Sequence, residues 1–431
     1  MASIEDLAST IKEQVSKLSA LHQEIGTPLP TFEPSGFADY STESNTPHGN
    51  ALRDTRNQIL DAALDLIRLV RGPTEHLLTL SWATADSSNL DLITRFNLPQ
   101  HVPLDSTTTF EELSVATQIP AGYLARIVRY GIANGIFVET EPGVIGHSAS
   151  SAALVKNQYL FNIVHFGLFL SNLMLKSPDF LQAQRDDPAN APKTPFQIAY
   201  RTEKDMFQFF HENTDVAKEY HEYLAGRVNT PLWSVDRLRT AWPWASKGEV
   251  TVVDVGGSVG HTVQALAPLM PEAKFIVQDN NTGSLEMGRQ AVENDSDLKS
   301  RISFTEYDFF TPQPVQADVY IYRHIMHDWN DEDSTKILSS LLPALKPGAR
   351  VLISEGTLPP PPATRLNTLA SKMIRIEDSF MLGAHDARER SVADFESLFQ
   401  QVKPGAFRLV GVTSGSQDGA FQSLLDFEFL G

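Results

Sequence analysis

Cysteine is absent from the 431 residues of this sequence. Its absence excludes disulfide bonds, cysteine nucleophiles and thiolate metal sites, and it fits a reducing compartment. Positive charge is also scarce, because 35 lysine and arginine residues stand against 53 aspartate and glutamate residues, which gives a formal net charge of -18. Nucleic acids and anionic membranes would repel such a chain, so we expect it to bind neither of them.

Long apolar runs are few as well. The longest, residues 160–175, contains two asparagines, a histidine and a serine, and it is shorter than the roughly 20 apolar residues of a membrane-spanning helix. We interpret it as a buried helix. Residues 1–25 are polar and amphipathic, unlike a secretory signal. The sequence therefore predicts a soluble, cytoplasmic protein with two or three folded units.

The N-terminal part predicts two amphipathic helices. Apolar residues recur at helical spacing in residues 4–25 and 51–70, on either side of a stretch rich in proline, serine and threonine. The two helices carry more apolar surface than a free pair would bury. We expect residues 1–105 to form a helical region that mediates homodimerisation, although later helices of the same chain would also cover this surface.

Residues 106–152 predict a winged helix, with helices at 110–117 and 120–134 and a hairpin that turns at 141–143. Winged helices can recognise DNA. In this acidic chain the second helix offers only Arg126 and Arg129 as basic residues, so we expect a scaffold and not a DNA-binding element.

The next region, residues 153–243, is predicted to be helical, with apolar segments at 154–175 and 196–224. It is rich in phenylalanine and tyrosine. Most of these rings should pack in a core, and a minority could line an aromatic substrate pocket. Phe207 is our candidate for a substrate contact from this region.

The stretch 249–279 organises the rest of the chain. Its β-branched run predicts a strand buried on both faces of a parallel sheet, and Asp254 within that run needs a partner. A loop rich in glycine follows, where missing β-carbons let the backbone turn sharply and a ligand approach closely. The loop residues are Gly256, Gly257, Ser258, Val259 and Gly260.

After this loop, a helix from about 261 to 270 leads to a second apolar strand that ends at Asp279. An acidic residue at that place can accept hydrogen bonds from ribose hydroxyls. Ser258 stands where the dinucleotide fingerprint requires glycine, so a pyrophosphate site is disfavoured. The order of strand, loop, helix, strand and acid predicts a site for a nucleoside cofactor.

Strands and helices continue to alternate through residues 244–431, which predicts a doubly wound, Rossmann-like α/β domain. The last two apolar runs, 407–412 and 421–429, should pair antiparallel at one edge. Ligands of such sheets bind beyond the carboxyl ends of the strands. The polar residues predicted at these ends are Asp279, Asp308, Arg323 and Glu355.

His327 lies just after one of these strand ends, and two carboxylates support it: Glu355 at the end of the adjacent strand and Glu389 in the segment ARERS. A carboxylate bonded to one imidazole nitrogen orients the ring and stabilises the imidazolium. Such a histidine can deprotonate a phenol or enol whose oxygen attacks an electrophilic methyl group, and no metal is required. Alternatively, Glu389 is a helix-start carboxylate beside Arg390.

Four segments, DVGGSVGH, RHIMHDWNDED, SEGTLPP and ARERS, resemble the small-molecule O-methyltransferases of plants and fungi, here the fungal secondary-metabolite branch. The resemblance covers nearly the whole chain and implies a class I methyltransferase fold, N-terminal dimerisation helices and S-adenosylmethionine as cofactor. It implies His327 as base with Glu355 and Glu389 beside it. The glycine loop would hold the methionine part of the cofactor, Asp279 the ribose, and Asp308 and Phe309 the adenine. The cofactor candidates are Asp254, Gly256, Gly257, Ser258, Gly260, Asp279, Asp308, Phe309 and Arg323.

The resemblance leaves more than one reaction open. O-methylation of a hydroxylated aromatic or polyketide-derived small molecule is favoured by the set of His327 and its two glutamates. Some fungal members of the family instead bind the cofactor but catalyse dehydrations or pericyclic reactions, such as Alder-ene or hetero-Diels–Alder chemistry on a quinone methide. Arg323 and Lys336 are candidate donors for that chemistry. A third interpretation is a winged-helix regulator that senses the cofactor, which the acidic charge disfavours. The candidate substrate contacts are Phe207, Met326 and Lys336, and His324 occupies a position where many relatives carry an apolar residue or tryptophan.

Overall fold

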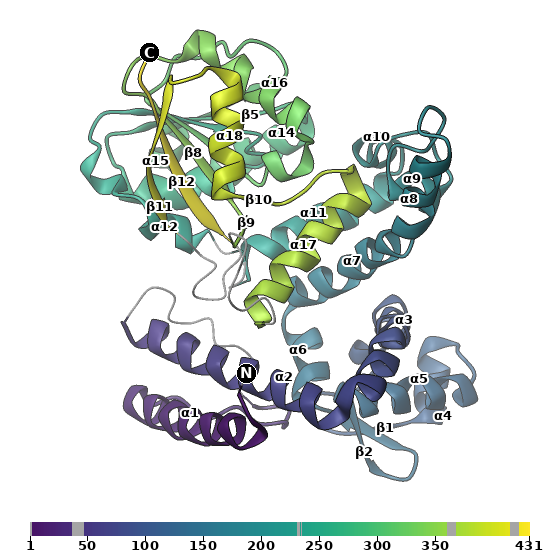
Figure 1. Cartoon of the computed structure of the whole chain (residues 1–431). Coiled ribbons are helices and arrows are strands. Elements are labelled where there is room, and N and C mark those ends of the chain that lie inside the picture. The colour runs from purple at the N-terminus through teal and green to yellow at the C-terminus, as the bar shows by residue number, and fades with distance from the viewer. Residues whose placement is uncertain (1, 37–46, 231–232, 234, 360–367, 414–421) are drawn as a thin grey trace. The chain divides into compact units, whose positions relative to one another are not determined.

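The computed structural model describes residues 2–36, 47–230, 233, 235–359, 368–413 and 422–431 (Figure 1). Its contacts divide the chain into two compact units. Unit 1 contains Met1–Leu175 and Phe207–Thr230, and unit 2 contains Lys176–Met206 and Pro231–Gly431. The boundaries predicted near residues 106, 153 and 244 stay predictions of local organisation.

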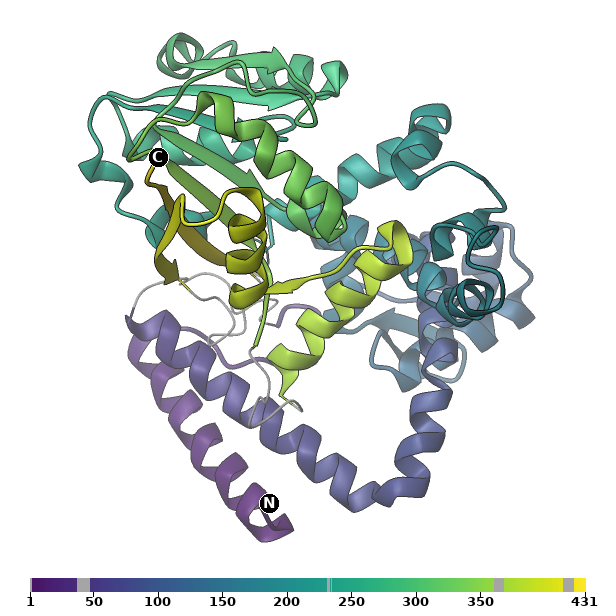
Figure 2. The same ribbon diagram turned by 45° about the horizontal axis from the view of Figure 1, so that its top comes forward.

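Unit 1 begins with two long helices that lie side by side (Figure 2). Helix α1 (Ile4–Ile25) is closed at its start by a capping box between Ser3 and Asp6. Helix α2 (Pro47–Ser81) is longer than predicted and is kinked at Gly72. Gly72 has a non-helical φ of 68°, and Pro73 after it has no backbone N–H to donate to the helix. The kink changes the direction of the apolar stripe partway along α2.

The two helices and the hairpin predicted for the winged helix are present. Helices α4 (Phe110–Thr117) and α5 (Ala121–Ala133) are followed by a hairpin, and the three strands pair in the order β1-β3-β2. Arg129 on α5 donates to Glu139 of the wing at 2.7 and 2.9 Å, so one of the two basic residues of this helix serves the scaffold. The remaining elements of this part are α3 (Ala83–Arg95), η2 (Leu98–His101), β1 (Thr108–Thr109), β2 (Phe137–Glu141) and β3 (Val144–His147).

The other helices of unit 1 pack through aromatic side chains. Phe166 on α7 (Gln158–Met174) lies 5.1 Å from Tyr223 and 5.5 Å from Tyr220, ring centroid to centroid, and both tyrosines belong to α11 (Thr214–Val228). By length and composition alone, the stretch Gln158–Asp186 could cross a membrane. The structure divides it into two helices, and only part of α7 is fully buried, at Phe166, Leu170 and Leu173. The remaining helices are α6 (Ala149–Lys156) and α10 (Met206–Glu212).

Unit 2 is built on a seven-stranded sheet in the order β11-β12-β8-β7-β4-β5-β6. The strands β4 to β8 are parallel, and β12 runs antiparallel to both β8 and β11, which confirms the predicted edge pair. The chain leaves β4 in one direction and returns at β7 on its other side, which places a topological switch point between these two strands. The strands are β4 (Thr251–Val255), β5 (Lys274–Asp279), β6 (Ile302–Glu306), β7 (Val319–Arg323), β8 (Arg350–Glu355), β11 (Phe407–Thr413) and β12 (Ser423–Phe429).

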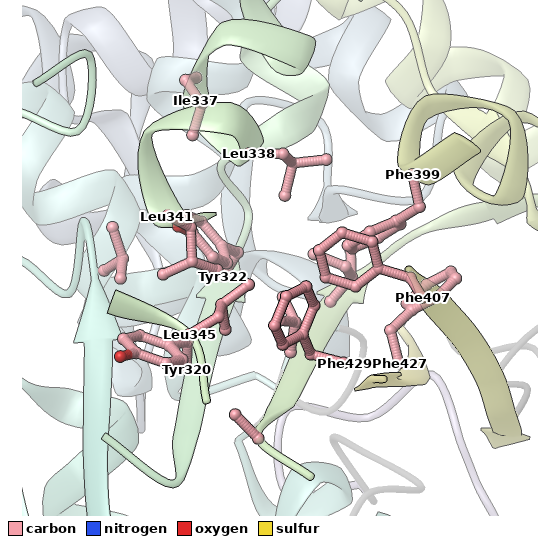
Figure 3. Close-up of a cluster of buried hydrophobic side chains, with 14 of the residues drawn as sticks. Tyr320, Tyr322, Ile337, Leu338, Leu341, Leu345, Phe399, Phe407, Phe427 and Phe429 are labelled. Atoms are coloured by element: carbon pink, nitrogen blue, oxygen red, sulfur yellow. The ribbon is translucent and has the colours of Figure 1, made fainter. Parts of the chain in front are cut away.

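Both faces of this sheet are covered, because its strands alternate apolar side chains toward two separate clusters. In β4, Val253 belongs to one cluster and Val252 to the other. The first cluster contains the apolar faces of α16 and α18 and four phenylalanines near the edge pair, of which Phe399 and Phe427 stack at 3.9 Å (Figure 3). The helices of unit 2 are α8 (Ser177–Asp186), α9 (Pro195–Tyr200), α12 (Asp236–Ala241), η3 (Trp244–Ser246), α13 (His261–Leu266), η4 (Ala267–Leu269), α14 (Thr282–Val292), α15 (Ser296–Arg301), η5 (Met326–Asp328), α16 (Asp331–Leu341), η6 (Leu342–Ala344), α17 (Leu369–His385) and α18 (Val392–Val402).

A small parallel ladder positions the predicted catalytic segments. Strand β9 (Thr357–Leu358), just after Glu355, pairs with β10 (Arg390–Ser391), just after Glu389. Ser391 also forms a capping box with Asp394 at the start of α18. The ladder and this cap together fix the backbone on both sides of the two glutamates.

Candidate active site

The glycine loop closes tightly over the end of β5. The backbone N–H groups of Gly256 and Gly257 both donate to the carbonyl of Gln278, at 2.7 and 3.0 Å. Gly256 has a φ of 71°, and a β-carbon there would clash with the side chain of Ile325. A β-carbon on Gly257 would lie 2.6 Å from Oδ2 of Asp254. Glycine is therefore required at both positions, and the backbone of this loop is bare.

Two acids hold the neighbouring loops in place. The carboxylate of Asp279 accepts hydrogen bonds from the backbone N–H of Ser258 at 2.9 Å and of Asn281 at 2.8 Å. The exposed Asp308 accepts one from Phe310 N–H at 3.0 Å. Phe309 lies edge-on to Trp329, with ring centroids 5.8 Å apart. The structure thus brings the predicted ribose and adenine candidates to the same edge of the sheet as the glycine loop.

Asp254 is buried in β4 with 1% of its surface exposed. Burial raises the pKa of its carboxyl to about 7, the positive charge of Arg323 opposes this rise, and the negative charge of Asp279 adds to it. Within the part of the chain that the structure describes, Oδ2 of Asp254 accepts no hydrogen bond. Arg323 itself donates to the carbonyl of Trp233 at 2.7 Å. The partner that the sequence led us to expect for Asp254 is therefore a nearby charge and not a direct hydrogen bond.

His327 lies in η5, directly beyond β7, and its side chain is only 5% exposed. Its Nδ1 is 2.8 Å from Oε1 of Glu389, as the sequence predicted. Burial disfavours the charged ring, but the negative charges of Glu389, Asp328 and Glu355 and the hydrogen bond to Glu389 raise the pKa of His327 to about 10. Because Nδ1 is engaged by the carboxylate, Nε2 is the ring nitrogen left for proton transfer.

Glu355, which the sequence predicted to flank His327, supports it through the backbone. Its Oε1 accepts the backbone N–H groups of Ile325 at 3.0 Å and of Met326 at 2.5 Å. Burial raises its pKa to about 7, while the positive charge of His327 lowers it. Glu355 therefore fixes the backbone that carries His327 and contributes its charge, and Glu389 makes the hydrogen bond to the ring.

Sequence reasoning missed Arg390 as a part of this site. Its guanidinium is 1% exposed and donates to the carbonyls of Met326 at 2.5 Å and Trp329 at 2.8 Å, on either side of His327 and Asp328. It also bonds Asp331 at 2.7 and 3.0 Å. The only signal in the sequence was its place next to Glu389. One segment therefore supplies both the carboxylate that binds the ring of His327 and the guanidinium that binds the backbone around it.

His324 also lies near the predicted base. Its ring centroid is 5.2 Å from that of His327, and its Nε2 contacts the side-chain amide of Gln422 at 2.5 Å. Its φ of 54° lies in the left-handed region, which a residue other than glycine rarely adopts. Gln422 was not identified from the sequence, because it directly precedes β12, almost a hundred residues away.

The three candidate substrate contacts have different surroundings. Met326 is completely buried in the core cluster, and its substrate role stays a prediction. Lys336 is exposed on α16 and paired with Glu332 and Asp333, both at 2.9 Å. Its substrate role stays a prediction as well. Phe207 belongs to unit 1, where 38% of its surface is exposed, and its substrate role stays a prediction.

Comparisons with known proteins agree with this geometry. The family model of the O-methyltransferase domain matches residues 182–403. The chain is 31% identical to the O-methyltransferase aoiF of Aspergillus oryzae, over 93% of this chain and 94% of that protein. It is also 31% identical to the chlorophenol O-methyltransferase of Trichoderma longibrachiatum, over 94% and 86%.

Solved structures with the same fold are more distant in sequence. OxaC in complex with SAH and oxaline matches with a TM-score of 0.73 and 22% identity, over 98% of this chain and all of that chain. A structure described as a pericyclic reaction enzyme matches with a TM-score of 0.71 and 20% identity, over 98% and 100%. The matched domain spans more than half of the sequence and a relative above 30% identity spans nearly all of it, so the chain belongs to the S-adenosylmethionine-dependent O-methyltransferases of the fungal secondary-metabolite type.

Proposed function

We propose that this enzyme methylates a hydroxyl group of an aromatic or polyketide-derived small molecule, with His327 as the general base. The observation that supports this proposal best is the buried pair of His327 and Glu389, with side chains 5% and 2% exposed and 2.8 Å between Nδ1 and Oε1. A carboxylate in that position orients the ring and stabilises the imidazolium that forms when Nε2 takes a proton. The likeness to a chlorophenol O-methyltransferase supports a phenolic or enolic acceptor.

The proton affinity of His327 suits such an acceptor. Phenols of the tyrosine type have a pKa near 10, and the pKa of His327 is raised to about 10. Once the ring of His327 is neutral, a proton can therefore move from the hydroxyl to Nε2 at little free-energy cost, which leaves an oxygen with enough negative charge to act as a nucleophile. S-adenosylmethionine, when bound, supplies the electrophilic methyl group. Glu355 and Arg390 keep the ring in position during this transfer, because both hold the backbone of Met326.

The residues around the glycine loop fit this cofactor. A bare backbone at Gly256 and Gly257 leaves room for its methionine part, and the buried Oδ2 of Asp254, without a hydrogen bond in the described structure, suits its positive charge. Ser258, Gly260 and Arg323 complete that side of the proposed site. We assign the ribose hydroxyls to Asp279, and we assign the adenine to Asp308 and Phe309.

The experiment for this function uses purified protein, S-adenosylmethionine and phenols of graded acidity. S-adenosylhomocysteine and the methylated product are followed by mass spectrometry. For weakly acidic phenols we expect His327→Ala to lower turnover by about 100-fold or more, the usual contribution of a general base. With a phenol that is already ionised at the assay pH, such as 2,4,6-trichlorophenol, the turnover of His327→Ala should fall much less. An equal loss for both kinds of phenol would refute His327 as the base.

A pericyclase or dehydratase is the second candidate, and the charge of His327 favours it. A ring with a pKa of about 10 is protonated at neutral pH before any ligand binds, and its Nε2–H is then a donor that can polarise a carbonyl or protonate a leaving hydroxyl. The fold shared with a pericyclic reaction enzyme is compatible with this chemistry. Substrate conversion that requires S-adenosylmethionine but forms no S-adenosylhomocysteine would identify it.

We also propose that the enzyme works as a homodimer through the second half of α2 and the adjoining Trp82. This segment exposes an apolar surface although the chain is strongly charged, and side chains of this kind commonly mark an interface. The exposed fractions are 51% for Leu69, 69% for Val70, 63% for Leu77, 56% for Leu80 and 63% for Trp82. A second copy of the same helix would cover this surface by an isologous contact.

A cytoplasmic location is part of the same proposal. The lack of cysteine fits a reducing compartment, and the acidic surface fits a solute without affinity for anionic lipid. Fractionation of cells that express a tagged full-length chain tests the location, and recovery in the membrane pellet after a high-salt wash would contradict it.

A further inference from the structure

The carboxylate of Asp328 lies between two buried imidazoles of unit 2. Its Oδ1 is 3.6 Å from Nε2 of His327 and 3.6 Å from Nε2 of His385. His385 is the last residue of α17, and its side chain is 7% exposed. One carboxylate oxygen thus faces the reactive nitrogen of the proposed base on one side and a second histidine on the other.

The two rings differ in charge. Burial lowers the pKa of His385, and the positive charge of His327 lowers it further. The negative charges of Asp328 and Asp205 act in the opposite direction. The pKa of His327 is raised instead, since Glu389, Asp328 and Glu355 all face it. At neutral pH the ring of His385 is therefore neutral and the ring of His327 carries a proton, with Oδ1 of Asp328 between them.

This arrangement bears on a requirement of the proposed reaction. A base must be neutral before it can accept the proton of a hydroxyl, and His327 must lose its proton again after every turnover. Its Nδ1 is held by Glu389, so the proton leaves from Nε2. Among the ion-pair contacts of the described residues, Asp328 is the acceptor on the Nε2 side.

We propose, resting on the proposed function, that His385 takes up the proton that leaves His327 when the positively charged cofactor binds, with Asp328 as the intermediate carrier. In the first step the N–H bond at Nε2 of His327 breaks and an O–H bond forms at Oδ1 of Asp328. In the second step that O–H bond breaks and an N–H bond forms at Nε2 of His385. The imidazolium of His385 then releases a proton to solvent on the side of Asp205, an exposed residue. No oxidant, metal or further reactant enters the balance.

The distances set how the transfer occurs. At 3.6 Å neither contact is a hydrogen bond, so the carboxylate must approach each nitrogen by about 0.7 Å or act through a bridging water. The exposure of Asp328, 18% for its side chain, leaves it more freedom than the two rings have. A carboxylate that moves between two fixed imidazoles is well suited to alternate contact with each of them.

A purely structural role for His385 would be a histidine that ends a helix and pairs with a nearby acid. The two roles differ in what they control. A structural histidine affects folding, whereas a relay controls how fast the ring proton of His327 reaches solvent. A small diffusible base can replace a missing relay but cannot replace a missing packing contact.

The first test measures proton exchange directly and needs no substrate. The full-length protein is labelled with 15N-histidine, and the exchange of the ring N–H of His327 with water is followed by NMR. We expect His385→Gln to slow this exchange by at least about tenfold. Imidazole added as the probe at about 50 mM should restore the rate. Exchange at the wild-type rate in His385→Gln would overturn the relay.

A second variant keeps the test decisive if His385→Gln does not fold. Asp328→Asn keeps the size of the carrier and both histidines but removes the acceptor, so it should slow the exchange as well, and an unchanged rate there would also refute the relay. The control is His101→Gln, at an exposed histidine of unit 1. In this variant the ring N–H of His327 should exchange at the wild-type rate.

Turnover provides an independent readout that rests on the proposed function. With a weakly acidic phenol, His385→Gln should turn over more slowly than the wild type and should be rescued by imidazole, whereas 2,4,6-trichlorophenol should show neither effect. A deficit that imidazole does not relieve would contradict the relay. If His327→Ala retains methyl transfer while His385→Gln still slows ring exchange, the base assignment fails and the relay stands.

Discussion

Replacement of Glu389 by glutamine tests the electrostatic basis of the site. The substitution keeps a group that can hydrogen-bond to Nδ1 of His327 but removes the negative charge 2.8 Å from it. A single opposite charge at this distance shifts a pKa by about 1 to 3 units, or about 1.4 to 4 kcal/mol. We therefore expect the pKa of His327 to fall from about 10 by that amount.

The sign of the stability change follows from the same shift. The raised pKa of His327 stabilises the folded protein fully below the unfolded value of 6.5, and this stabilisation is lost as the pH rises through about 10. The glutamine variant should therefore be less stable than the wild type at pH near 6, by about 1.4 to 4 kcal/mol, and the difference should shrink toward zero above pH about 10. Residual effects of the amide are independent of pH.

Two measurements decide this prediction. Titration of the His327 ring by 15N NMR gives the pKa directly, and urea unfolding at several pH values gives the difference in free energy of unfolding. Glu389→Asp, which keeps the charge, is the matched control and should retain a raised pKa. A His327 pKa that is the same in the wild type and in Glu389→Gln, or a stability loss that is equal at low and high pH, would refute the electrostatic argument.

Three further substitutions and one titration follow from the structure. Gly257→Val fills the space beside Asp254 and should lower S-adenosylmethionine affinity by about 100-fold or more by calorimetry, since the loop must move to admit the side chain. Arg390→Met removes a buried guanidinium that donates to two backbone carbonyls and to Asp331, and it should cost about 3 kcal/mol in urea unfolding. Leu77→Asp should convert a dimer to a monomer in light scattering. Because Glu355 has a pKa of about 7, binding of the cationic cofactor nearby should release protons, and the cofactor affinity should rise with pH through about 7. Calorimetry in buffers of different ionisation enthalpy measures the protons released.

Matched controls make these outcomes specific. Gly122→Ala lies in an open position on α5 and should leave cofactor affinity unchanged. Arg388→Met removes a half-exposed ion pair with Asp331 and should cost less than about 1 kcal/mol. Val115→Asp, at a residue 83% exposed on α4, should leave the oligomeric state as it is. An effect of equal size in a control would contradict the corresponding prediction.

The fold was largely predictable because its signals are local. The β-branched run of β4, the glycines after it and the acid at the end of β5 lie within about thirty residues, and each follows from backbone sterics or strand patterning. The antiparallel edge pair was predictable for the same reason. The length of α2 was not, since its kink at Gly72 would ordinarily predict the end of a helix.

The site was less predictable because its contacts join distant segments. The sequence identified His327 and Glu389 as partners but not the geometry of Glu355, which binds two backbone N–H groups in place of the ring. Arg390 was missed because a buried guanidinium that serves carbonyls has no signature of its own in sequence. The burial of Met326 was not predicted, because a residue next to His327 can face the core as well as a substrate.

The charges around His327 explain why these polar groups are retained in a buried place. Three carboxylates, Asp328, Glu355 and Glu389, face the ring of His327, and the guanidinium of Arg390 is the other cation of the cluster. Burying carboxylates together is unfavourable unless cations compensate them, and here two cations stand against three acids, one of which titrates near neutral pH. The cluster is therefore balanced in the free protein by a proton on His327, and a positively charged ligand bound nearby allows that proton to leave. In the mechanism that we propose, such a site becomes a competent base only when a cation is present, which would link the protonation of His327 to binding at the proposed cofactor site.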